Sequence, residues 1–248
     1  MSDHFSAVAQ TYAQARPHYP AALFDWLSGL CDQHDLAWDC GAGSGQASVA
    51  LADHFKTVMA TDVSAAQIAQ AASHPGVTYR VAPAEDSGLA ASSVDLVTVA
   101  QALHWFDVAR FFAEVRRVLR PGGVVAAWTY GIVQVEGEAV DARVQTFYRD
   151  EIGGYWPPER RHVEEGYRSI PFPFDRIEAP PFAMAVDWTL GELLAYFRSW
   201  SATARYVRER GTDPVAELAL SLGPLWGDPQ TRRRVTWPLS VLAGRVPA

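Results

Sequence analysis

Short apolar runs alternate with stretches of helical periodicity between residues 36 and 128. This alternation is typical of βαβ units and predicts an α/β fold with a mostly parallel sheet. The clearest helix is predicted over residues 108–119, where apolar side chains recur at helical spacing and charged side chains occupy the other positions. The Arg-Pro-Gly-Gly run at 120–123 is expected to end that helix. The strands predicted in this region are 36–40, 57–61, 77–81, 94–100 and 123–128.

On either side of this region the pattern is less regular. Residues 1–30 have helical periodicity that breaks at 16–20 and resumes over 21–30. Six prolines between residues 155 and 181 predict an irregular, cap-like stretch. The elements predicted beyond it are a strand, a helix and a final strand that pairs with the first as a hairpin, over 182–189, 190–210 and 236–246.

The composition is that of a folded domain. Hydrophobic residues make up 49% of the 248 residues, which excludes a disordered chain and suits one domain with an insertion or cap. The 28 acidic residues outnumber the 21 basic ones, and the net charge of −7 disfavours a nucleic-acid partner. No run approaches the ~18 apolar residues that a membrane span needs, so no membrane partner is expected.

The two cysteines, Cys31 and Cys40, are typical of free thiols in a reducing compartment rather than of a disulfide framework. The N-terminal residues lack the basic start and the apolar run of a signal peptide. A cytoplasmic protein is therefore expected. No group of His, Cys, Asp and Glu residues has the spacing of a metal site, so no metal is expected either.

The segment 38–46, Trp-Asp-Cys-Gly-Ala-Gly-Ser-Gly-Gln, lies where the first predicted strand ends and a helix begins. Its alternate glycines let a ligand approach the backbone closely, and N–H groups at the start of the helix can face anionic atoms. Asp62 ends the second predicted strand, where a carboxylate can accept the hydroxyl protons of a ribose. The pattern predicts a nucleoside-containing ligand. Two alternatives remain: the glycines form an ordinary tight turn, or Asp62 caps a helix that begins near Ser64.

The spacing of the glycines distinguishes between nucleoside ligands. A dinucleotide fingerprint would have its third glycine at position 46, where this chain has Gln46. The Gly-x-Gly-x-Gly run preceded by Asp39 resembles motif I of the class I, Rossmann-like S-adenosylmethionine-dependent methyltransferases. Three further stretches resemble the segments of that family that hold the adenine ring, cover the methionine part of the cofactor and precede the fifth strand: 82–86, 93–106 and 119–123.

The resemblance covers residues 35–130 and is to the type 11 methyltransferases, while residues 12–20 resemble the lid of the subgroup that includes trans-aconitate methyltransferase. It implies a three-layer Rossmann-like methyltransferase sandwich, whose mostly parallel seven-stranded sheet has an antiparallel final strand. The implied parts are an N-terminal helical lid, an S-adenosylmethionine-binding core, and a cap or substrate region with the last sheet strands, over 1–30, 31–130 and 131–248.

The resemblance also implies which residues contact the cofactor. Many relatives have an acidic residue where this chain has Pro83, so the backbone around Ala84 and Glu85 is expected to hold the adenine ring. The implied cofactor-binding residues are Tyr12, Arg16, Asp39, Gly41, Gly43, Gly45, Asp62, Val63, Ala84, Glu85 and Gln101.

The implied activity is methyl transfer from S-adenosylmethionine to a small-molecule acceptor. A carboxylate acceptor is favoured and needs no general base, whereas a hydroxyl acceptor would need one and an amine stays possible. His104 is the candidate base. The candidate substrate-binding residues are Trp105, Trp188, Trp200 and Tyr206.

Two other functions remain as alternatives. One is a non-catalytic protein that binds S-adenosylmethionine and acts as a regulator. The other is a dinucleotide-dependent oxidoreductase, which Gln46 disfavours.

Overall fold

The computed structural model describes residues 17–247, which belong to two units. The first, here called the core unit, consists of Tyr19–Gly131, Arg161–Ala183 and the chain from Pro238 onward. The second, here called the helical unit, consists of Ile132–Arg160, Met184–Trp237 and residues up to His18, of which the structure describes 17 and 18.

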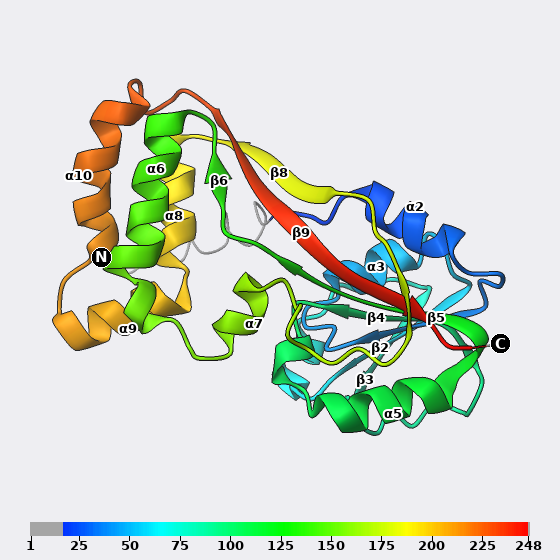
Figure 1. Ribbon diagram of the computed structural model, residues 1–248. Coiled ribbons are helices and arrows are strands. Elements are labelled where there is room, and N and C mark those ends of the chain that lie inside the picture. The colour runs from blue at the N-terminus through cyan, green and yellow to red at the C-terminus, as the bar shows by residue number, and fades with distance from the viewer. Residues whose placement is uncertain (1–16, 248) are drawn as a thin grey trace. The chain divides into compact units, whose positions relative to one another are not determined.

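Five parallel strands form the centre of the sheet in the core unit, in the order β3-β2-β1-β4-β5 (Figure 1). Strand β9, Arg233–Arg245, runs antiparallel to β5, and β7, Asp175–Ile177, runs antiparallel to β9. The expected α/β class and the antiparallel final strand are thereby confirmed. The parallel strands are β1 Leu36–Cys40, β2 Thr57–Asp62, β3 Val77–Val81, β4 Val94–Ala100 and β5 Leu119–Tyr130.

The strand count differs from expectation. Two more strands pair with β9, namely β6, Gln134–Val135, and β8, Phe182–Trp188. The pairing of β8 with the final strand is as predicted, although three helices separate the two strands in the sequence and they do not form a simple hairpin. Within the described residues the sheet therefore has nine strands instead of seven. The reason is the length of β9, which spans 13 residues and leaves room for several short partners.

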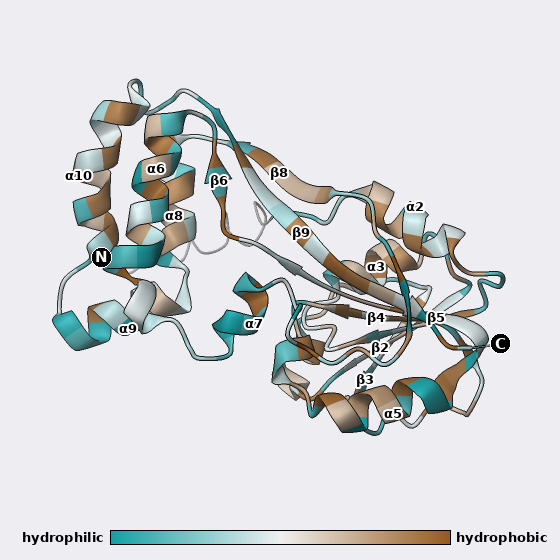
Figure 2. Cartoon of the chain, in the orientation of Figure 1, coloured by the Kyte–Doolittle hydropathy of each residue, from teal (hydrophilic) through white to brown (hydrophobic). Residues whose placement is uncertain are grey.

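Helices cover both faces of the sheet in the core unit (Figure 1). On one face, α2 (Ala21–Gly29) and α3 (Gln46–Leu51) bury apolar side chains against the strands. On the other face lies α5 (Val108–Val118), which alternates hydrophobic and hydrophilic residues along its length (Figure 2). This is the expected three-layer sandwich. The short helix α4, Ala65–Ala69, follows β2.

Two predicted boundaries were wrong. Strand β5 begins at Leu119 instead of residue 123. The register with β4 shifts from Val94↔Leu119 to Leu96↔Val124, so the Arg-Pro-Gly-Gly run forms an irregularity within the strand instead of preceding it. The single helix expected over 190–210 is two helices, α8 and α9. Trp200 has an extended backbone and separates them.

The helical unit contains α6, α8, α9 and α10 (Figure 1), together with the π-helix η2 and the 3-10 helix η3. Aromatic side chains of α8, η2 and the chain around Trp200 fill its interior. Within residues 17–247, no helix has the length and apolar character needed to cross a bilayer. The bounds are α6 Glu138–Thr146, η2 Phe147–Glu151, η3 Gly153–Tyr155, α8 Leu190–Arg198, α9 Ser201–Arg210 and α10 Pro214–Trp226. The short helix α7, Arg160–Glu164, belongs to the core unit from Arg161 onward.

The two units do not follow the three consecutive parts expected from the sequence. Helix α2, placed in the lid, contributes Leu23, Phe24 and Leu27 to the buried core beneath the sheet. The segment Arg161–Ala183, placed in the cap region, also returns to the core unit. Tyr12 and Arg16, the remaining lid candidates, lie outside the described residues.

Candidate cofactor and acceptor site

The glycine loop connects β1 to α3 at the carboxyl edge of the parallel strands, where ligands bind in open α/β sheets. The N–H groups of Gly41 and Ala42 both donate to the carbonyl oxygen of Thr61, at 2.8 and 3.0 Å. The N–H of Gly45 donates back to Ala42 O at 2.9 Å. These three N–H groups are therefore used by the protein itself, while the expectation that the N–H groups at the start of α3 face a ligand stays a prediction.

The alternate glycines of this loop have different reasons to lack a side chain. A Cβ at Gly41 would lie 2.6 Å from the Cβ of Ala102, and one at Gly45 would collide with the hydroxyl of Tyr79. A Cβ at Gly43 would meet no atom of the described part of the chain within 4 Å, although its φ of +54° still favours glycine. The space beside Gly43 is thus open to a ligand.

Asp62, at the end of β2, is joined to this loop. Its Oδ2 accepts a hydrogen bond from Gly43 N at 2.9 Å, and its Oδ1 accepts one from Ser64 N at 2.8 Å. The N-cap of α4 is Ser64, whose own hydroxyl accepts from Gln67 N, so Asp62 does not cap the helix itself. Each carboxylate oxygen keeps acceptor capacity, because an ionised carboxylate offers about four lone-pair positions. The next residue, Val63, is 77% exposed.

Asp39 is fully buried beneath the glycine loop. Ser48 Oγ of α3 donates to its Oδ2 at 2.6 Å, and Thr98 Oγ1 of β4 donates to its Oδ1 at 2.9 Å. Burial raises the pKa of the Asp39 carboxyl group to about 6, although these two hydrogen bonds oppose the rise. Asp39 therefore joins β1, β4 and α3, and it orients the glycine loop from below.

The loop after β3 is held to α5 by carboxylates. Glu85 Oε1 accepts from the backbone N–H of Asp107, the N-cap of α5, at 3.0 Å. Glu114 accepts from both the N–H and the hydroxyl of Ser87 and forms an ion pair with Arg117 at 2.7 Å. The hydrogen bonds from Arg117 hold the pKa of the Glu114 carboxyl group at about 2. The side chain of Glu85 is thus engaged by α5, while Ala84 beside it is nearly buried.

Gln101 follows β4 with a φ of +58°, which is unusual for a residue other than glycine. Its Oε1 accepts from Thr129 Oγ1 at 2.8 Å, which fixes the orientation of the amide. Its Nε2 is buried and has no hydrogen-bond partner among residues 17–247. Because a buried donor without a partner costs free energy, this amide fits a ligand that supplies an acceptor.

His104 and Trp105 lie in η1, the short 3-10 turn Leu103–Trp105 that follows Gln101. The Nδ1 atom of His104 lies 3.0 Å from the hydroxyl oxygen of Tyr167, and its ring packs against Trp105 with 4.8 Å between centroids. Trp105 is 60% exposed, so this edge of the core unit presents an aromatic face to solvent.

Comparison with known proteins identifies the family. A family model described as a methyltransferase domain matches residues 38–127. A Dictyostelium discoideum protein named as a methyltransferase is 35% identical over 224 residues, which cover 89% of this chain and 85% of that protein. A Saccharomyces cerevisiae protein named as an S-adenosylmethionine-dependent methyltransferase is 25% identical and covers 85% of this chain and 84% of its own. A solved structure from Anaeromyxobacter dehalogenans, named as a type II methyltransferase, is 52% identical, covers 94% of this chain and 99% of its own, and superposes with a TM-score of 0.90.

The chain belongs to the class I S-adenosylmethionine-dependent methyltransferases. Its cofactor is S-adenosylmethionine, as predicted. Both alternatives, the dinucleotide-dependent oxidoreductase and the non-catalytic binding protein, are set aside. The narrower subgroup that includes trans-aconitate methyltransferase stays a prediction.

Three of the predicted substrate residues of this methyltransferase belong to the helical unit. Trp188 is 4% exposed and packs against Tyr196 at a centroid distance of 5.3 Å. Trp200 packs against Phe197 at 4.6 Å, and Tyr206 packs against Tyr155 at 4.9 Å. All three thus have packing partners within the helical unit, and their contact with an acceptor stays a prediction.

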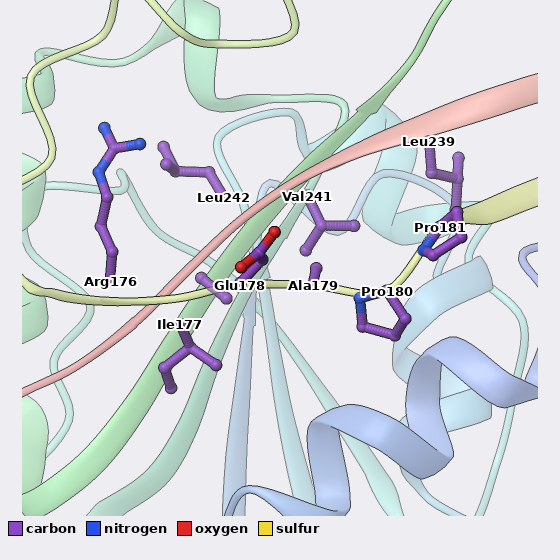
Figure 3. A pocket seen from close by; sticks show the side chains of 10 residues that line it. Arg176, Ile177, Glu178, Ala179, Pro180, Pro181, Leu239, Val241 and Leu242 are labelled. Carbon is purple, nitrogen blue, oxygen red and sulfur yellow. The ribbon is translucent and has the colours of Figure 1, made fainter.

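A cavity of about 560 Å³ lies beside β9, where residues 178–181 connect β7 to β8 (Figure 3). None of the predicted cofactor-binding residues within 17–247 lines it, so the methyltransferase site is not assigned to this cavity. The lining residues are Arg176, Ile177, Glu178, Ala179, Pro180, Pro181, Leu239, Val241, Leu242 and Ala243.

Sequence reasoning missed the residues that support the site. The pairing of Asp39 with Thr98 could have been found, because the two residues are register partners in adjacent strands. The anchoring of the loop after β3 by Glu114 had no signal beyond a charged position on a predicted helix. Tyr167 had no signal at all, since it lies in the proline-rich stretch without periodicity.

Proposed function

We propose that this methyltransferase transfers a methyl group to a small-molecule acceptor, with its cofactor bound at the carboxyl edge of β1, β2 and β4. The observation that carries the proposal is the hydrogen bond from Gly43 N to Asp62 Oδ2. It joins the open glycine of the loop to the acid that follows the second strand. A nucleoside with its ribose near Asp62 would therefore extend along the loop past Gly43.

Asp62 and its neighbours would hold the adenosine part. The free lone pairs of the Asp62 carboxylate accept the ribose hydroxyl protons. The exposed side chain of Val63 offers an apolar surface to the adenine ring. Backbone groups at Ala84 and Glu85 meet the edge of the ring, since the Glu85 carboxylate is bound to Asp107 N.

Gln101 would hold another part of the cofactor through its buried Nε2 donor. Asp39 would support cofactor binding indirectly, by orienting the glycine loop, because its carboxylate is fully buried and hydrogen-bonded to Ser48 and Thr98. Tyr12 and Arg16 complete the proposed set as residues that close over the cofactor, with the Arg16 guanidinium available to a carboxylate.

A carboxylate is the favoured acceptor. The cofactor supplies a methyl group on a positively charged sulfonium, so the protein needs to orient the acceptor, exclude water and match charge. A carboxylate is already ionised at pH 7 and needs no base. The exposed indole of Trp105 is the proposed wall of the acceptor site.

A hydroxyl acceptor is the second candidate, and the pairing of His104 with Tyr167 favours it. An alcohol or phenol loses a proton as it is methylated. The imidazole of His104 is the group that could take that proton.

The first test is cofactor binding by the Asp62→Ala variant, measured by isothermal titration calorimetry. We expect at least tenfold weaker binding of S-adenosylmethionine, because both the ribose acceptor and the tie to Gly43 are lost. Ser64→Ala is the control. This variant removes the hydroxyl that caps α4 but keeps the backbone N–H that donates to Asp62, so its affinity for S-adenosylmethionine should be nearly unchanged. Equal affinity of Asp62→Ala and the wild type would remove Asp62 from the site.

The acceptor class is tested by transfer of a labelled methyl group to a panel of small carboxylic acids, phenols, alcohols and amines. Carboxylic acids should accept the label under the favoured proposal. Labelling confined to amines would contradict both candidates.

A further inference from the structure

Gln101 is tied to strand β5 through both its backbone and its side chain. Its N–H donates to Trp128 O at 2.9 Å, and its Oε1 accepts from the hydroxyl of Thr129, the next residue of β5, at 2.8 Å. The side chain of Thr129 is fully buried. These two contacts hold Gln101 at its φ of +58°, a conformation that a residue other than glycine keeps only where its surroundings enforce it.

The Thr129 hydroxyl decides which end of the Gln101 amide faces β5. An amide could present either its oxygen or its NH2 group to Thr129. Within residues 17–247 the buried Thr129 hydroxyl has one partner, Gln101, so only the amide oxygen gives its O–H an acceptor. The reversed amide would leave that O–H and the amide oxygen without partners, which costs free energy. The NH2 group is therefore the end of the amide that is left for a ligand.

The position of Gln101 in the sheet indicates which part of the cofactor would reach it. Strands β2 and β4 are the two neighbours of β1, so Asp62 at the end of β2 and Gln101 after β4 flank the glycine loop. Ala102 lies against this loop, since a Cβ at Gly41 would be 2.6 Å from the Ala102 Cβ. A cofactor with its adenosine part at Asp62 would bring its methionine part toward Gln101.

The methionine part of the cofactor has a single group that accepts hydrogen bonds at pH 7. Its sulfonium is positively charged, and its amino group is an ammonium that only donates. Its carboxylate is ionised at this pH and accepts. An amide NH2 group can only donate, and a hydrogen bond to a carboxylate is stronger than one between neutral groups. The carboxylate is therefore the group that matches the Gln101 donor.

We propose that Thr129 is a positioning residue that orients the Gln101 amide so that its Nε2 donates to the methionine carboxylate of S-adenosylmethionine. Thr129 acts through Gln101 and needs no contact with the cofactor. This inference rests on the proposed function, because it requires the adenosine part to bind at Asp62. It makes recognition of the methionine part separable from recognition of the nucleoside.

Two nucleosides test this separation by isothermal titration calorimetry. S-adenosylhomocysteine has the carboxylate, whereas methylthioadenosine lacks the whole amino-acid part. Gln101→Leu removes the donor, so it should weaken binding of S-adenosylhomocysteine about tenfold or more. Its affinity for methylthioadenosine should stay within about twofold of the wild type, because the nucleoside contacts are kept.

Thr129→Val tests the positioning role, since it keeps the shape of the side chain and removes only the hydroxyl. Binding of S-adenosylhomocysteine should weaken about threefold to tenfold, while that of methylthioadenosine stays within about twofold. Thr129→Ser keeps a hydroxyl and should restore the affinity. In the Gln101→Leu background, Thr129→Val should have no further effect, because the amide that it orients is absent.

Thr203→Val is the matched control. It removes another buried threonine hydroxyl, which donates to Phe197 O at 2.8 Å in the helical unit, and both affinities should stay those of the wild type.

Kinetics give a second readout for Thr129→Val. The KM for S-adenosylmethionine should rise, whereas kcat should stay within about twofold, because the carboxylate is not at the reacting centre.

Three results would overturn the inference: equal weakening of both nucleosides in Gln101→Leu, an unchanged affinity of that variant for S-adenosylhomocysteine, or an effect of Thr129→Val that is as large in the Gln101→Leu background as in the wild type. Failure of the proposed function is distinct. It would show as equal affinity of Asp62→Ala and the wild type for methylthioadenosine.

Discussion

Asp39 illustrates how a single buried carboxylate can be costly to stability and still support a site. Its two oxygens accept from Ser48 and Thr98, and no part of it reaches solvent. Burial penalises the charged form more than these two hydrogen bonds restore it, and so the pKa of Asp39 rises to about 6. The folded protein thus holds a proton on Asp39 at a pH where the unfolded chain, with a pKa near 3.9, has released it.

This difference predicts how stability depends on pH. A raised carboxyl pKa means that stability falls as pH rises from about 4 to about 6, and that the loss is complete above that range. The Asp39→Asn side chain cannot ionise. The free energy of unfolding of this variant minus that of the wild type should therefore increase by about 3 kcal/mol as the pH rises from about 4 to about 6. Urea unfolding of both proteins at pH 4, 5, 6 and 7 is the measurement.

Asp53→Asn, which changes an exposed carboxylate after α3, controls for the loss of one negative charge. If the free energies of unfolding of Asp39→Asn and the wild type differ by the same amount at every pH, Asp39 does not titrate between pH 4 and pH 6.

The glycine loop is the element that connects the fold to the cofactor, and its glycines divide by role. Gly41 is required by the protein, since a side chain there would meet Ala102 and Phe106. Gly43 borders open space, and its N–H is bound to Asp62. Gly41 is therefore needed for close packing of the protein, whereas Gly43 leaves space for the ligand.

Alanine substitutions should separate these roles. Gly41→Ala adds a clash to a strained φ of +70° and should lower the free energy of unfolding by about 2–5 kcal/mol. Gly43→Ala adds no clash and should lower it by only about 1–2 kcal/mol, yet it should weaken S-adenosylmethionine binding at least tenfold. Denaturant unfolding and titration calorimetry on the same samples are the measurements. Equal stability loss in the two variants, or full cofactor affinity in Gly43→Ala, would contradict this division.

For the whole molecule, the main feature is that the core unit is assembled from three separate stretches of chain. The middle stretch contributes buried side chains to the cluster beside α5, among them Val163, Tyr167 and Phe174. Phe174 packs against Phe112 of α5 with 5.3 Å between ring centroids. The stability of the core unit therefore depends on residues far beyond its last parallel strand.

Phe174→Ala tests this dependence. It should destabilise the protein by about 3–5 kcal/mol, because a buried aromatic ring is replaced by a cavity. Leu220→Ala removes a comparably apolar side chain that is 81% exposed on α10, and it should change stability by less than about 0.5 kcal/mol. The measurement is chemical denaturation followed by circular dichroism. A small effect of Phe174→Ala would mean that the core unit does not need this segment.

The features predicted correctly are those with a local signal. The five parallel strands were found because each is a short apolar run, a signal that a short window of sequence contains. The boundaries that failed, at the start of β5 and within 190–210, depend on strand register and on one extended residue, neither of which changes the apolar pattern.

The amino-acid sequence alone determined the α/β class, the glycine loop with its acid at Asp62, and through them the family and the cofactor. It could do so because neighbouring parallel strands end at one edge, so local spacing places these groups together. The tertiary structure alone decided that Asp39 is sealed, that Glu85 is bound to Asp107, and that Tyr167 meets His104. Those contacts depend on how distant or irregular segments pack, and packing leaves no periodic trace in the sequence.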